Sequence, residues 1–135
     1  MTSSHGVSAA CLVKTIDLVD AMTETKNPFR TAGYFFYLSA ALHVVAIVLS
    51  GGELFGTLAG AVVLWGLIGY FLITRPRRWL AHLGFIGALV GIVASVSVGT
   101  QYFGLTGMTM TAITLADIGA AVLLFGALWR SPVKA

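Results

Sequence analysis

Two ionisable side chains, His43 and Asp117, stand near the middle of long apolar stretches of the sequence. Ionisable groups deep inside a membrane are costly and usually face the protein interior, which makes them the first place to seek function. A carboxylate beside an imidazole can hold a proton between the two groups or share it with an ion. The sharpest chemical hypothesis is therefore an intramembrane pair formed by His43 and Asp117.

The same pair has plainer interpretations that the sequence leaves open. The two side chains can simply hydrogen-bond and lock their helices together, they can contact another subunit, or they can remain unpaired. Ser39 lies one helical turn before His43, and Thr114 lies one turn before Asp117. These two hydroxyl groups are candidate supporting polar residues for the pair.

Metal, haem and covalent chemistry find little support. With a rise of about 1.5 Å per residue, His43 and Asp117 lie roughly 18–19 Å from the inner ends of their helices, but His82 lies only about 5 Å from its own. His43 and His82 are then too far apart to ligate one haem, and His43 with Asp117 supplies too few ligands for a metal. Cys11 is a lone cysteine. We expect no catalytic, cofactor-binding or metal-binding residue.

The composition places these residues in a membrane protein. Of the 135 residues, 58% are apolar and 10% are charged, compared with roughly 25% charged residues in an average soluble domain. The net charge of +3 comes from basic residues beside apolar segments, without a nucleic-acid motif. No nucleophile elbow or P-loop is present. The sequence leaves enzyme activity uncertain without indicating one, and it predicts no nucleic-acid partner.

Four apolar runs must position the pair, and each is long enough to cross a bilayer as a helix. They are separated by breaks rich in glycine, proline or arginine, and residues 1–29 precede them as an amino-terminal segment. The predicted fold is all-α, an antiparallel bundle of four transmembrane helices in a polytopic domain covering residues 30–135. The expected spans are residues 30–50, 54–74, 79–100 and 110–129.

The basic residues predict the orientation, because lysine and arginine near span ends stay in the cytoplasm. With four spans, all eight lysine and arginine residues fall on one side of the membrane, and the loops on the other side carry no basic residue. They are Lys14, Lys26, Arg30, Arg75, Arg77, Arg78, Arg130 and Lys134. We therefore expect a multi-pass protein of the cell inner (plasma) membrane with both termini in the cytoplasm.

The amino-terminal segment lacks the unbroken apolar core of a signal peptide. Residues 7–25 carry Leu12, Ile16, Val19 and Met22 at near-helical spacing, which predicts an amphipathic helix ended by Asn27-Pro28. Such a helix lies on the inner membrane surface or against the bundle, or it docks to a partner protein.

Small residues predict how the spans pack, since membrane helices associate where their backbones approach closely. A ridge of small residues recurs every four positions in the third span, formed by Gly87, Gly91, Ser95 and Gly99. Small residues recur every four positions in two other spans as well. They are Gly56 and Gly60 in the second span and Ala112, Ala116 and Ala120 in the fourth. We expect residues 79–100 near the centre of the bundle, with the ridge used for internal packing or for binding another subunit.

Three functions fit these observations. Small size, the packing ridge and the lack of a catalytic set favour an accessory or structural subunit of a larger membrane complex. The alternative is a small oligomeric transporter, channel or proton-coupled carrier that uses His43 and Asp117. A redox or lipid-modifying enzyme completed by another chain is a third class. The expected partners are the lipid bilayer and either other membrane subunits or further copies of this chain.

Overall fold

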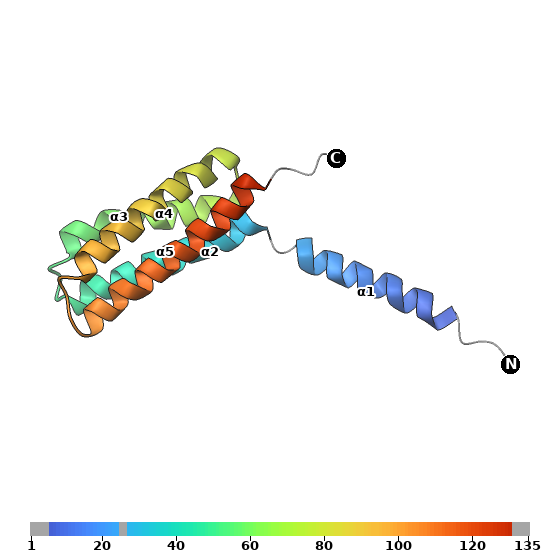
Figure 1. Cartoon of the computed structure of the whole chain (residues 1–135), viewed down its shortest axis with the longest axis horizontal. Coiled ribbons are helices and arrows are strands. Elements are labelled where there is room, and N and C mark those ends of the chain that lie inside the picture. The colour runs from blue at the N-terminus through green and yellow to red at the C-terminus, as the bar shows by residue number, and fades with distance from the viewer. Residues whose placement is uncertain (1–5, 25–26, 131–135) are drawn as a thin grey trace.

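The computed structural model describes residues 6–24 and 27–130, and the regular structure in this part of the chain is entirely helical (Figure 1). The last four of its five helices are long and apolar enough to cross a membrane. The predicted all-helical chain with four such segments is confirmed, as expected of a small integral membrane protein. The helices are α1 (Gly6–Glu24), α2 (Pro28–Leu49), α3 (Phe55–Thr74), α4 (Arg78–Gly99) and α5 (Leu105–Trp129).

Local sequence signals explain where the helices begin. The Asn27 side chain accepts a hydrogen bond of 3.0 Å from the Phe29 amide, and Pro28 occupies the first turn, so the predicted break at Asn27-Pro28 is also the start of α2. Helix α5 begins at Leu105 instead of residue 110. Gly104 adopts a φ of 72°, a conformation that favours glycine, and its carbonyl accepts the first helical hydrogen bond.

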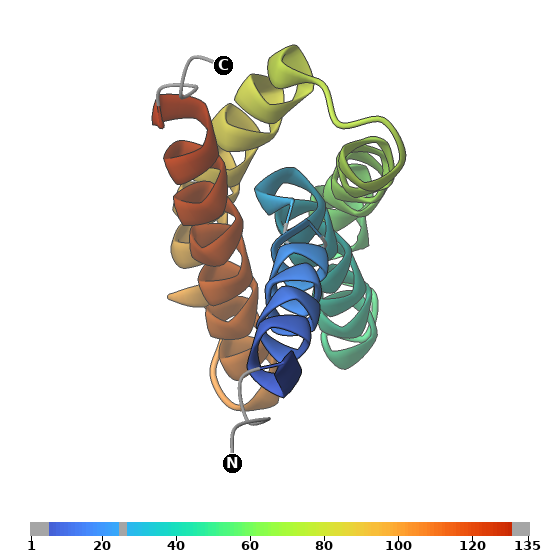
Figure 2. The same cartoon turned by 90° about the vertical axis from the view of Figure 1, so that its right-hand side faces the viewer.

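The helices α2–α5, called here the four-helix unit, are not equally packed against one another. Helix α2 packs along both α3 and α5, and α4 packs along α5, whereas α3 and α4 touch at only a few points. Figure 2 shows α2 and α5 side by side. The two helices that hold the unit together are thus α2 and α5, and not residues 79–100 as the ridge had suggested. The interface between α3 and α4 has the fewest contacts of these four interfaces and is called the α3–α4 seam.

The closest helix crossing is made by two glycines that the sequence did not single out. A Cβ atom at Gly33 of α2 would lie 3.0 Å from the Gly69 carbonyl oxygen, and one at Gly69 would lie 2.9 Å from the Gly33 carbonyl oxygen. The backbones of α2 and α3 therefore meet directly here. By contrast, nothing lies within 4 Å of the Cβ positions of Gly56 and Gly60, so these predicted small residues do not pack against another helix.

The ridge of α4 faces two neighbours. Gly91 and Ser95 are buried in the unit. A Cβ at Gly99 would lie 3.1 Å from Met110 of α5, and one at Gly87 would lie 3.8 Å from the Ile68 side chain of α3. The ridge therefore lies on the interior side of α4 within the chain.

Two apolar clusters form the core, with a polar layer between them. The larger cluster contains Phe36, Trp65 and Leu124, and the smaller one contains Leu58 and Ile113. Along their helices, His43 of α2 and Asp117 of α5 fall between members of the two clusters. Ser39, one turn before His43, and Ser95 of α4 are also buried. This polar layer consists of Ser39, His43, Ser95 and Asp117.

One end of the four-helix unit, called the basic end, carries five arginines. The Arg30 Nε atom donates to the Ile73 carbonyl and the Arg78 guanidinium donates to the Leu128 carbonyl, both at 3.1 Å. These bonds satisfy carbonyls at the ends of α3 and α5. The others at this end are Arg75, Arg77 and Arg130. Lys26 and Lys134, which also contributed to the predicted orientation, lie outside the described residues.

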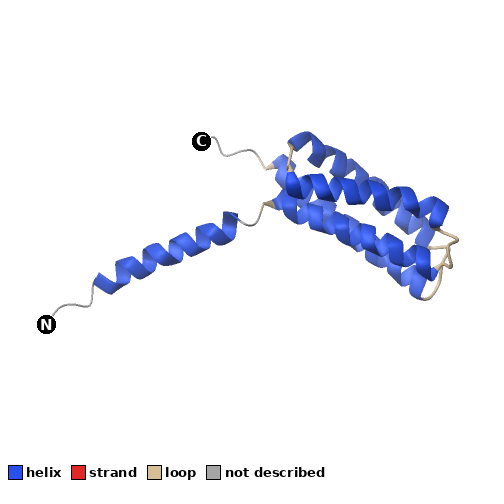
Figure 3. Ribbon diagram, turned by 180° about the vertical axis from the view of Figure 1, so that it is seen from behind, coloured by secondary structure: helices blue, strands red, loops and turns tan. Residues whose placement is uncertain are grey.

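Helix α1 extends away from the four-helix unit and packs along none of its helices (Figures 1 and 3). The predicted amphipathic segment is helical, and Leu12, Val13 and Ile16 are more than half exposed. The side chains of Val19 and Met22 lie outside the described residues. Helix α1 thus presents apolar side chains that no other described helix covers.

The glycine crossing generates a stability prediction. Gly69→Ala should destabilise the protein by about 1–3 kcal/mol, because the added methyl group overpacks the contact with the Gly33 backbone. Gly60→Ala, in the same helix but facing open space, should leave stability unchanged or raise it by roughly 0.5–1 kcal/mol. Thermal unfolding in a mild detergent measures both variants. Equal melting temperatures for the two would contradict the close crossing.

Candidate functional site

The Asp117 carboxyl group forms the centre of the polar layer. It is completely buried, and its Oδ1 atom accepts hydrogen bonds from Ser39 Oγ at 2.7 Å and from Trp65 Nε1 at 3.0 Å. Ser39 belongs to α2, Trp65 to α3 and Asp117 to α5. One carboxyl oxygen therefore joins three of the four helices.

The other carboxyl oxygen of Asp117, Oδ2, is buried and has no hydrogen-bond partner among the described residues. It lies against Gly91 of α4, where an added Cβ atom would collide with Oδ2 and would lie 2.8 Å from the Trp65 ring. An ionised carboxylate would leave this oxygen without a donor, and a carboxylic acid protonated at Oδ2 would leave its hydroxyl group without an acceptor. In either protonation state, one oxygen of the Asp117 carboxyl group is therefore hydrogen-bonded and the other is not.

His43 is also buried, and its ring is fixed by two contacts. Its Nδ1 atom lies 2.7 Å from the Ser39 carbonyl oxygen, and its ring packs on Trp65 with centroids 6.2 Å apart. Because a carbonyl oxygen only accepts, Nδ1 donates its hydrogen, which leaves Nε2 as the nitrogen that can take up or release a proton. His43 and Asp117 share Ser39 and Trp65 as neighbours, but no hydrogen bond joins them within residues 27–130.

The other predicted supporting residue lies elsewhere in the layer. The Thr114 hydroxyl group lies 2.7 Å from the Ser95 hydroxyl group, and it donates to the Met110 carbonyl of its own helix at 3.0 Å. Thr114 therefore connects α5 to α4 and does not contact Asp117 through a hydrogen bond. Together with the Asp117 bonds, this contact ties all four helices at one level.

A cavity of about 240 Å³ opens on the α3–α4 seam, in the half of the unit away from the basic end. Its walls are mainly apolar, but His43, Thr57 and Ser95 add polar atoms, and Trp65 and Gly91 separate it from Asp117. Several water molecules fit in such a volume, and they need polar partners of this kind to be stable there. The cavity, called the α3–α4 cavity, therefore has the His43 side chain as part of its wall.

The remaining candidate groups lie apart from this site. His82 is exposed at the basic end, where its Nδ1 atom lies 2.8 Å from the Arg78 carbonyl oxygen. Cys11 is exposed on α1. Within residues 6–24 and 27–130, no three His, Cys, Asp or Glu side chains lie close enough to hold a metal ion together. No family model matches the chain, and neither a curated protein nor a solved structure is significantly similar to it.

Trp65 was not among the residues predicted for the site, although the sequence contains a usable signal for it. Tryptophan in membrane helices prefers the two interfaces, whereas Trp65 lies in the middle of α3. A buried indole N–H also needs an acceptor, and Asp117 is one of two carboxylates in residues 27–130. These two facts together would have favoured a bond between Trp65 and Asp117.

The hydrogen bond from Ser39 can be tested with a matched serine. Ser39→Ala should destabilise the protein by about 0.5–2 kcal/mol, the range of interhelical hydrogen bonds in membranes. Ser97→Ala is the control, because the exposed Ser97 hydroxyl group donates only to the Val93 carbonyl of its own helix. Thermal unfolding in detergent should separate the two variants, and an equal loss in both would show that the bond to Asp117 contributes nothing.

Proposed function

We propose that this protein is a small membrane carrier that transports protons, with Asp117 as the group that holds the transported proton. The observation that carries the proposal is the buried Oδ2 atom of Asp117, which has no hydrogen-bond partner in residues 6–24 and 27–130 and lies behind the wall of the α3–α4 cavity. A carboxyl group used only to lock helices would be expected to have both oxygens satisfied, since each unpaired buried polar atom is costly.

His43 supplies the route between the cavity and the carboxyl group. It lines the α3–α4 cavity, and Nδ1 is held by the Ser39 carbonyl, so its Nε2 atom is the one that exchanges protons with water. Ser39 and Trp65 contact both His43 and Asp117 and keep the two groups in one layer. In this proposal, His43 passes protons between the cavity and Asp117.

The size of the cavity limits the substrate. Ligand pockets for drug-sized molecules measure about 300–1,000 Å³, larger than the 240 Å³ observed here. The cavity is therefore suited to water, an ion or a solute of a few heavy atoms. With the basic end in the cytoplasm of a bacterial inner membrane, as the arginines favour, it opens toward the outer half of the bilayer.

A proton-flux measurement tests this function. In liposomes with an imposed pH difference, we expect the purified protein to accelerate proton entry and Asp117→Asn to return the rate to that of protein-free liposomes. The amide oxygen still accepts from Ser39 and Trp65 but takes up no proton. Ser97→Ala should retain the full rate. Flux that persists in the folded Asp117→Asn variant, or none above background in the unmodified protein, would contradict the proposal.

An accessory subunit of a larger complex is the second candidate, and helix α1 favours it. Leu12, Val13 and Ile16 are exposed on a helix that packs along no other described helix. An apolar helix face of this kind binds either a membrane surface or a groove in another protein.

The mass of the detergent-extracted particle that contains this chain distinguishes a proton carrier from an accessory subunit. Extracted from its native membrane in mild detergent, an accessory subunit should run in a large particle with other proteins, and Leu12→Glu/Ile16→Glu should release it. Lys14→Glu, which changes a charged position of the same helix, is the control. A small particle containing only this chain, unaffected by either change, would remove the support for an accessory role.

A further inference from the structure

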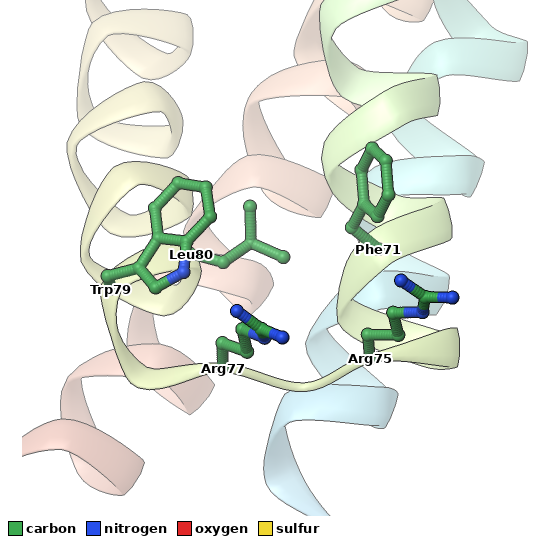
Figure 4. A pocket seen from close by; sticks show the side chains of 5 residues that line it. All are labelled: Phe71, Arg75, Arg77, Trp79 and Leu80. Atoms are coloured by element: carbon green, nitrogen blue, oxygen red, sulfur yellow. The ribbon is translucent and has the colours of Figure 1, made fainter.

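The basic end of the α3–α4 seam holds a second pocket, of about 220 Å³, which is called the arginine pocket. Its lining combines two arginines with three apolar or aromatic side chains: Phe71, Arg75, Arg77, Trp79 and Leu80. Figure 4 shows the two guanidinium groups along the loop between the helices, with Phe71 on α3 and Leu80 on α4 above them. The pocket is therefore cationic at its mouth and apolar toward the interior of the unit.

Arg75 and Arg77 differ from Arg30 and Arg78 in having no side-chain partner among the residues that the structure describes. Arg30 and Arg78 donate to carbonyl oxygens at helix ends, but Arg75 and Arg77 make no side-chain hydrogen bond or ion pair with any described residue. The two carboxylates of residues 27–130 lie elsewhere, Glu53 in the loop at the opposite end and Asp117 in the polar layer. The arginine pocket thus carries uncompensated positive charge.

The backbone of α4 adds donors at the same place. Arg77 occupies the N-cap of α4, and no side chain caps this helix end. The first amide groups of a helix have no partner within the helix, and their dipoles favour an anion. Trp79 and Leu80, which line the pocket, belong to this first turn. The first turn of α4 therefore borders the arginine pocket.

We propose that the arginine pocket binds the phosphate group of an anionic phospholipid. Basic pockets between transmembrane helices recognise such headgroups, and arginine forms strong bidentate hydrogen bonds with phosphate. Trp79, which is 62% exposed, lies at the level where tryptophan contacts the headgroup region. Phe71 and Leu80 accept the upper part of an acyl chain, which distinguishes a lipid from free phosphate. This site does not depend on the proposed carrier function.

Native mass spectrometry of the purified full chain tests the site. Titrated with phosphatidylglycerol, the unmodified protein should bind more tightly than it binds phosphatidylcholine with the same acyl chains. Arg75→Gln/Arg77→Gln should weaken the binding of phosphatidylglycerol about 30-fold, which corresponds to about 2 kcal/mol. Lys14→Gln/Arg130→Gln removes the same charge outside the pocket and should have little effect.

Two comparisons decide whether the arginine pocket is a phospholipid site. If the two double variants lose affinity equally, the attraction comes from net charge and the pocket is not a binding site. Glycerophosphoglycerol, the headgroup without acyl chains, should bind much more weakly than the lipid, and equal binding would overturn the assignment to a lipid. The single variants Arg75→Gln and Arg77→Gln, each with a smaller loss, replace the double variant if its thermal unfolding shows that it is not folded.

Discussion

The burial of the Asp117 carboxyl group is the constraint on which the rest of the four-helix unit depends. A polar group without solvent must find donors within the protein, and Asp117 finds them on α2 through Ser39 and on α3 through Trp65. These two bonds fix the rotation of three helices about their axes. They also require a glycine at position 91, because any side chain there would occupy the space of the carboxyl oxygen.

The loose α3–α4 seam follows from the same constraint. Trp65 reaches from α3 toward Asp117 of α5, so its large ring fills the space in which α3 and α4 would otherwise meet, and Gly91 is the position where α4 comes closest to it. Helix α4 is therefore held mainly through α5, including the contact between Ser95 and Thr114. Two openings, the α3–α4 cavity and the arginine pocket, lie along this seam.

The sequence predicted the helices well because apolar length and glycine-rich breaks are local signals. It predicted helix partners poorly, since a small residue shows where a backbone can approach but not which helix approaches it. Gly60 and Gly69 are both glycines of α3, yet only Gly69 meets another backbone. In the candidate site, polarity singled out His43 and Asp117, whereas Trp65 was missed because an aromatic ring in an apolar segment resembles ordinary core. The functional roles of His43 and Asp117 stay predictions.

The distribution of contacts also determines which part of the unit can move at least cost. Helices α2, α3 and α5 are tied by the Asp117 bonds and by the Gly33–Gly69 crossing, and separating them would expose a buried carboxyl group. Moving α4 away from α3 alone breaks few contacts, whereas moving Gly91, the residue that covers the unpaired carboxyl oxygen, away from Asp117 also breaks the packing of α4 on α5. An opening of the seam would thus widen the α3–α4 cavity while α4 stays packed on α5 and Gly91 still covers Asp117. The packing therefore makes the α3–α4 seam the interface that separates with the fewest lost contacts, and it keeps the buried Asp117 carboxyl group within the three tightly joined helices.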